Sequence, residues 1–156
     1  YMTRTRVEFV LSNRLREMIA LQIMYLVGYN HSHNLPAWTL DRVVESLGLP
    51  GEPTHRMINV LVGAGYLTEI IDDDVPFYLP PHAIETMRLA DIISDVRKAN
   101  ESRILSMSRL ISVPAIDALI AEVDAAGKEV LGERTVKDLV ESGGDLPDMN
   151  AAGIPA

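Results

Sequence analysis

The sequence predicts a mainly α-helical fold with one β-hairpin, and three observations between Thr39 and Pro80 support this prediction. Apolar residues recur at helical spacing in two short runs. A glycine-containing corner separates the two runs. The composition then changes to β-branched and aromatic residues on both sides of three aspartates. Two helices, a tight turn and a hairpin, in this order, are the outline of a winged helix-turn-helix in which the hairpin is the wing.

The first helix of this unit is predicted to begin after Thr39, a favourable N-cap, and to stop at Gly48. The second helix is predicted to begin at Pro53, because the missing N–H of proline has no partner at a first helical position, and to close at Gly65. The inner positions of the two helices are Leu40, Val43, Val44 and Leu47 in the first and Met57, Ile58 and Leu61 in the second. The second helix occupies the place of a recognition helix.

The hairpin is predicted over residues 66–71 and 75–79, with Asp72, Asp73 and Asp74 between the strands. The triple aspartate lacks the spaced oxygen ligands and the glycine of a calcium loop. A turn is therefore the favoured interpretation, because aspartate tolerates the left-handed backbone that hairpin turns require.

A long helix capped by Ser12 is predicted to precede this unit. Apolar residues such as Met18, Ile23 and Val27 extend around much of its circumference, so it needs burial on more than one side. It can be the central helix of the fold, or its second apolar side can form a dimer interface through Ile23, and the two roles are compatible.

Residues 30–38 are predicted to form a loop that Trp38 packs onto the core. His31 and His33 have a spacing that could share a metal ion in an extended segment. No acidic or cysteine ligand lies beside them in the sequence, whereas a structural zinc site needs four ligands. We therefore expect exposed loop histidines and no metal site.

Further helices are predicted after the hairpin. One is amphipathic around Ile92, the next begins at Pro114, and the last is opened by Thr135 and Asp138, which resemble a capping box. Residues 98–108 are expected to be a hinge or a frayed helix end. These elements divide the chain into a winged-helix domain (residues 1–98), a helical extension that packs back on it (99–142) and a disordered tail (143–156).

Composition limits the chemistry that this chain can perform. The 156 residues carry a net charge of -8, which argues against a broad phosphate-binding surface. There is no cysteine, which excludes thiolate chemistry and Cys-ligated clusters and fits a reducing cytoplasmic compartment. The longest mainly apolar stretch, residues 18–28, is too short to span a bilayer. No nucleophile elbow, phosphate-cradling glycine loop or zinc motif is present, so we expect neither an enzyme nor a cofactor.

The outward face of the predicted recognition helix offers few groups for DNA. The candidates for contacts with base edges are Thr54, His55, Arg56 and Asn59. The wing presents carboxylates where DNA-binding proteins usually place Lys or Arg near phosphate. Protein contact is therefore the favoured use of this surface, and the candidate interface residues are Ile23, Val60, Val62 and Ile120.

Three segments, in order, resemble a known family: SNRLREMIALQIM, LDRVVESLGLP with MINVLVGAGYL, and VDAAGKEVLGERTVKDLV. Together they resemble the cytoplasmic C-terminal region of the YihY/BrkB family of bacterial inner-membrane proteins, once described as ribonuclease BN. The resemblance implies a membrane-spanning part upstream of Tyr1 and a location on the cytoplasmic face of the inner membrane. No residue set in this chain supports the ribonuclease activity.

A second family has the same outline, the iron–sulfur-sensing winged-helix repressors, in which a cluster-binding cysteine segment follows the wing. This chain has no cysteine, so that chemistry is excluded. Two hypotheses result. The favoured one is a non-catalytic interaction or regulatory domain of a YihY/BrkB-like membrane protein, with a protein partner or a second copy of the chain. The alternative is a DNA-binding winged-helix transcriptional regulator without an iron–sulfur cluster.

Overall fold

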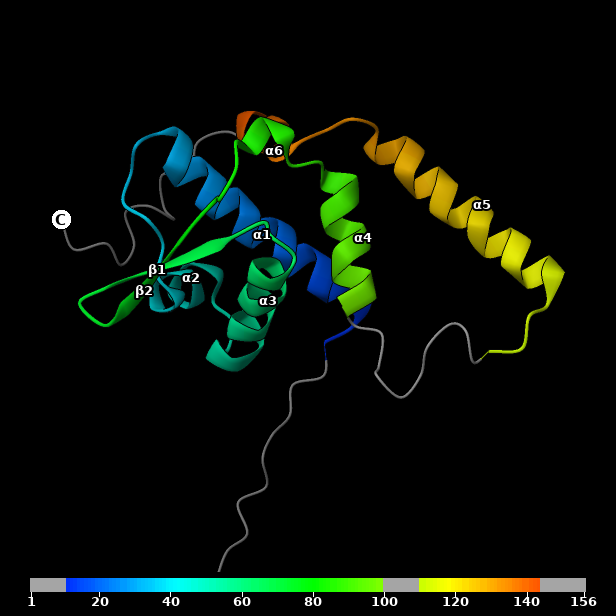
Figure 1. Ribbon diagram of the computed structural model, residues 1–156, viewed down its shortest axis with the longest axis horizontal. Helices are drawn as coiled ribbons and strands as arrows, with labels where there is room; N and C mark the ends of the chain where they lie inside the picture. The colour runs from blue at the N-terminus through cyan, green and yellow to red at the C-terminus, as the bar shows by residue number, and fades with distance from the viewer. Residues whose placement is uncertain (1–10, 100–109, 144–156) are drawn as a thin grey trace, which may run out of the picture.

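The computed structural model of the chain describes residues 11–99 and 110–143 (Figure 1). Its elements are α1 (Asn13–Ser32), α2 (Leu40–Leu47), α3 (Gly51–Gly63), β1 (Thr68–Asp72), β2 (Val75–Leu79), the 3-10 turn η1 (Ile84–Thr86), α4 (Leu89–Ala99), α5 (Pro114–Leu131) and α6 (Val136–Ser142). The predicted winged helix-turn-helix is confirmed. Most of the expected hinge, residues 98–108, lies outside the described residues. The expected tail, residues 143–156, also lies outside them, except for Gly143.

Helix α1 is the centre of the fold, with α3, α4 and α6 packed around it (Figure 1). Its N-cap is Ser12, whose hydroxyl accepts a hydrogen bond from the backbone of Leu15 at 3.2 Å. Ile23 and Met24 are completely buried in the middle of the helix. The need for burial on more than one side is thus met within the chain. The proposed role of Ile23 in a dimer interface is wrong, because its side chain lies in the core.

The connection from α1 to α2 is shorter than predicted, because α1 continues to Ser32. Asn30 is buried within the helix and donates a hydrogen bond to the Pro36 carbonyl oxygen at 2.9 Å, and this bond folds the chain back. Trp38 packs onto the core as expected: it is 1% exposed and its Nε1 donates to the carbonyl oxygen of Leu26 at 2.8 Å. The guanidinium group of Arg42 lies over the Trp38 ring, 4.7 Å from its centroid.

The helix-turn-helix follows its sequence signals closely. Thr39 caps α2, and Gly48 ends it in the left-handed region with φ 65°. Helix α3 begins at Gly51, which places Pro53 third in the helix instead of first, and it ends at Gly63. The earlier start is compatible with Pro53, because this residue still lies in the first turn, where its missing N–H costs no hydrogen bond.

The hairpin is a two-stranded antiparallel sheet in which Thr68 pairs with Leu79 and Asp72 with Val75. Asp73 and Asp74 form the two-residue turn, with φ 48° and 61°. Both central residues of a type I′ turn have positive φ, and such turns match the twist of the flanking strands. The triple aspartate thus takes the predicted part in a turn, although Asp72 itself is the last residue of β1.

The two C-terminal helices differ in how they are covered. Helix α6 packs on α1 and buries Val136 and Val140, and its capping box between Thr135 and Asp138 is present as predicted. Helix α5 begins at Pro114 as predicted but has no buried residue; its C-terminal end lies near α4, and its N-terminal end extends away from the other helices (Figure 1). Only part of the expected extension therefore packs back on the winged helix.

Candidate nucleic-acid interface

Helix α3 has one buried and one open face. Met57, Ile58 and Leu61 are completely buried and hold the helix against α1 and α2. Residues at positions between them are turned to solvent: His55 and Asn59 are exposed, and Arg56 is partly exposed. This is the arrangement that a recognition helix needs, because its inner face must be fixed before its outer face can enter a major groove.

Arg56 is held on the open face by Glu52, one turn earlier in α3. Their side chains form an ion pair of 2.9 Å and are 42% and 61% exposed. Pairs of this kind in helices are worth about 0.3–0.5 kcal/mol, so Arg56 can exchange Glu52 for a phosphate or a base edge at small cost. Arg56 is therefore the strongest DNA-contacting candidate on the helix.

Thr54 does not belong to this open face. Its side chain is completely buried, and its hydroxyl donates a hydrogen bond to the Pro50 carbonyl oxygen at 2.9 Å. The expected contact of Thr54 with base edges does not fit this structure. The sequence pattern placed Thr54 on the outer side of the helix. Its hydroxyl instead forms its hydrogen bond with the preceding turn, so it is not available to a base.

Val60 and Val62, expected at a protein interface, are partly buried and pack against the hydrophobic core. Val60 also borders a shallow depression beside the end of α4, together with Asn59 and Lys98. Most of the apolar surface of these valines is therefore already used inside the chain. Ile120, the fourth interface candidate, is 47% exposed on α5.

A buried cation that is not among the predicted site residues lies on α1, against α4. Arg16 of α1 is 6% exposed, and its Nη2 donates to the Val96 carbonyl oxygen at 3.5 Å. Its Nε has no hydrogen-bond partner, and no described carboxylate pairs with it. The helical period could have indicated this burial, because Arg16 lies on the same side of α1 as the buried residues Ile19 and Ala20.

The two arginines influence each other. Burial lowers the pKa of Arg16 first, and the positive charge of Arg56 lowers this pKa further. The exposed guanidinium group of Arg56 is itself a favourable partner for phosphate, because its ion pair with Glu52 is exposed and therefore weak. The open face of α3 around Arg56 is thus locally suited to phosphate, although the chain as a whole is acidic.

The wing provides no positive charge for contact with phosphate. Residues 66–80 contain neither Lys nor Arg, and the turn carries the aspartates described above. Ile70, Ile71 and Val75 are exposed on the two strands. Phosphate contact by this wing is therefore unfavourable, and any DNA contact must come mainly from α3 and its surroundings.

Metal ligands do not gather at this surface. In the parts of the chain that the structure describes, no group of three or more His, Asp or Glu side chains lies close enough to hold a metal ion. The ring of His33 stacks on that of Tyr29 with centroids 4.1 Å apart, and its Nδ1 lies 2.8 Å from the Tyr29 carbonyl oxygen. This histidine closes α1 at its C-cap.

Comparison with solved structures gives close matches over most of the chain. CymR of B. subtilis, the global cysteine regulator, is 21% identical, with a TM-score of 0.62 over 88% of this chain and 100% of that chain. IscR of T. potens is 17% identical, with a TM-score of 0.62 over 97% of both chains. CymR of Staphylococcus aureus is 20% identical, with a TM-score of 0.58 over 81% and 95%. Family models and curated proteins give no match.

These structures contradict the resemblance to the YihY/BrkB membrane proteins, because the chain matches CymR and IscR along nearly all their length. Among the described helices, none is long and apolar enough to cross a membrane. The matches to these regulators, and not the lack of such a helix, contradict the favoured hypothesis of an interaction domain of a membrane protein. The segments that suggested it contain Ser12, Gly48 and Thr135, which cap helices, and such signals recur wherever this fold does.

Proposed function

We propose that this protein is a DNA-binding winged-helix transcriptional regulator that works without an iron–sulfur cluster. The observation that carries the proposal is the open face of α3, where His55, Arg56 and Asn59 are turned to solvent while the opposite face is buried in the core. The structural likeness to CymR and IscR supports it. The absence of cysteine from the sequence removes the thiolates that would hold such a cluster. This function places the protein in the bacterial cytoplasm and requires no catalysis.

The charge distribution sets the character of the binding. An acidic chain with an acidic wing neutralises few phosphates, so the affinity depends less steeply on salt than for a basic regulator. Specific contact is left to Arg56, Asn59 and His55 on α3. One helix with so few base contacts gives limited affinity, and a second copy of the chain would supply a second half-site.

Helix α5 supplies a surface for that second copy. Its apolar stripe consists of Ile116, Leu119, Ile120 and Val123, which are 47–58% exposed. These positions recur every three or four residues, so they lie on one side of an 18-residue helix. We infer that the stripe pairs with its counterpart in a symmetric homodimer, because a self-complementary apolar surface is buried most simply by a two-fold axis.

The test begins with selection of bound duplexes from a randomised DNA library by the full chain. The affinity for the selected duplex is then measured by fluorescence anisotropy across a series of salt concentrations. Arg56→Ala should weaken binding by about tenfold, the cost of about 1–3 kcal/mol expected for one lost base contact. It should also reduce the slope of log affinity against log salt if Arg56 contacts phosphate.

Arg88→Ala is the matched control. Arg88 is 44% exposed and forms a 2.9 Å ion pair with Glu133, so it resembles Arg56 in exposure and pairing but lies at the start of α4. Its removal should leave DNA affinity unchanged. Equal losses in the two variants would mean that only net charge matters, and failure to select any duplex would overturn the proposal.

A further inference from the structure

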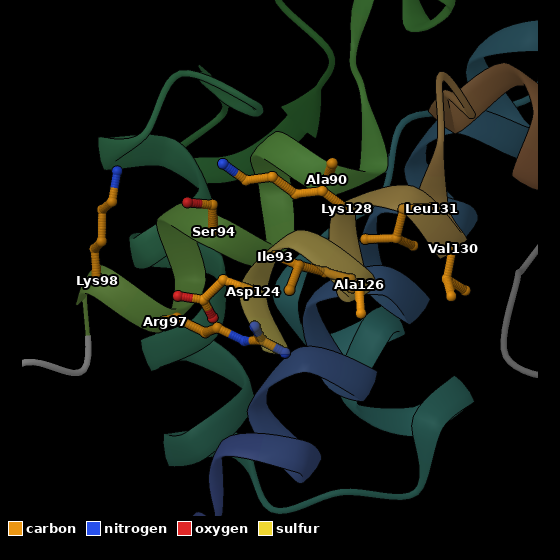
Figure 2. A pocket seen from close by; sticks show the side chains of 11 residues that line it. Ala90, Ile93, Ser94, Arg97, Lys98, Asp124, Ala126, Lys128, Val130 and Leu131 are labelled. Atoms are coloured by element: carbon orange, nitrogen blue, oxygen red, sulfur yellow. The ribbon is translucent and has the colours of Figure 1, made fainter. Parts of the chain in front are cut away.

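A cavity of about 710 Å³ lies between α4 and the C-terminal half of α5 (Figure 2). The side of α4 that borders it consists of Ala90, Ile93, Ser94, Arg97 and Lys98. From α5 the lining includes Asp124, Lys128 and Leu131. Cavities of about 300–1,000 Å³ with an apolar lining and a few polar groups are typical of small-molecule sites.

The cavity exists because α4 has two apolar sides. Leu89, Ile92 and Val96 are buried on the side of the core. Ile93 lies on the other side, toward α5, and is only partly buried, as is Leu131 opposite it. The two helices thus leave an apolar wall in contact with solvent, which a ligand with an apolar body would cover.

The charged groups of the cavity are not balanced. Arg97 is compensated: it donates a hydrogen bond to Glu17 at 2.5 Å, which raises its pKa, and Asp124 has a smaller effect in the same direction. Lys98 and Lys128 form no ion pair within the described residues. Figure 2 shows Lys128 extending from α5 over the cavity. Two lysine side chains, neither of them ion-paired with a described carboxylate, therefore line a partly apolar cavity whose lining also includes Asp124.

We propose that this cavity binds a small organic monoacid with an apolar body. The carboxylate lies against Lys128, which extends over the cavity, and can accept a hydrogen bond from the Ser94 hydroxyl, while Lys98 adds positive charge at the edge of the cavity. The apolar body packs against Ile93 and Leu131. A second carboxylate is disfavoured because Asp124 already supplies a negative charge on the Arg97 side of the cavity. This binding goes beyond the proposed DNA contact and does not depend on it.

Isothermal titration calorimetry of the full chain, without DNA, tests this site with three probes: sodium octanoate below its micelle concentration, neutral octanamide and the diacid suberate. Octanoate should bind at least tenfold more tightly than octanamide and more tightly than suberate. Equal affinities for octanoate and octanamide would overturn the proposal, because they would show that the lysines take no part.

Variants locate the binding. Lys128→Gln should weaken octanoate binding at least fivefold and leave octanamide binding unchanged. Lys137→Gln is the matched control, because Lys137 is an exposed lysine of α6 that does not line this cavity, and it should bind octanoate as the parent does. Ile93→Trp, checked by circular dichroism for an intact fold, should abolish binding of both probes. Unchanged octanoate affinity in Lys128→Gln or in Ile93→Trp would overturn the site.

Discussion

A β-carbon placed on Gly28 of α1 would lie 2.9 Å from Cγ1 of Val136 in α6 and 3.2 Å from Cγ2 of Val140. Val136 is completely buried at this contact. Glycine at position 28 therefore permits the close approach by which the C-terminal helix covers α1, more than a hundred residues away in the sequence.

Gly28→Ala should lower the free energy of unfolding by about 1 kcal/mol. Overpacking against Val136 and Val140 costs about 1–3 kcal/mol, which outweighs the roughly 1 kcal/mol that alanine gains over glycine within a helix. Urea denaturation measures the difference. Gly63→Ala is the control, because an added β-carbon there meets nothing within 4 Å and should not destabilise. A stabilised Gly28→Ala variant would show that α6 does not pack this closely.

Ionisation of Tyr66 should lower the free energy of unfolding at alkaline pH. Its hydroxyl donates to Oδ2 of Asp95 at 2.5 Å, and burial, followed by this bond, raises the pKa of Tyr66. A raised pKa means that the stabilisation is complete below the unfolded-state value of about 10 and is lost as pH rises above it. Tyr66→Phe should cost about 1.5 kcal/mol at pH 7.

The same variant gives the pH test. Between about pH 10 and 12 the unfolding free energy of the parent should fall more steeply than that of Tyr66→Phe, which has no proton to lose at this position. Tyr78, whose pKa is also raised by burial, is present in both proteins and cancels from the comparison. Parallel pH profiles would contradict the assigned role of Tyr66.

The capping box of α6 should be needed for a helix this short. Thr135 accepts a hydrogen bond from the Asp138 backbone at 3.3 Å, and the Asp138 carboxylate accepts one from the Thr135 backbone at 2.9 Å. Thr135→Ala should lower stability by about 1 kcal/mol, whereas Thr135→Ser retains the hydroxyl and should lose little. Thermal unfolding of the two variants makes the comparison, and equal losses would assign the effect to the methyl group instead.

The apolar stripe of α5 should control the oligomeric state. Ile120→Glu places a charge in the proposed dimer interface and should give a monomer in sedimentation at micromolar concentration, with an unchanged far-ultraviolet circular dichroism spectrum. Ala125→Glu adds the same charge on the opposite side of α5, where the residue is also exposed, and should leave the dimer intact. A parent chain that remains monomeric at high concentration would refute the interface.

The local elements of this protein are determined by sequence neighbours. Thr39 and Gly48 set the ends of α2, Asp73 and Asp74 set the hairpin turn, and Thr135 with Asp138 opens α6. Each signal acts through hydrogen bonds or backbone preferences that span at most a few residues, so it can be recognised without knowledge of the fold.

The tertiary structure decided which apolar and charged surfaces are used. In the sequence Ile23 and Ile120 look alike, yet the first is buried in the core of the fold while the second remains exposed on α5. The burial of Arg16 against Val96, and the presence of Lys98 and Lys128 in the lining of one cavity, likewise join distant segments. Periodicity defines which side of a helix is apolar, but only the packing of whole elements determines what covers that side.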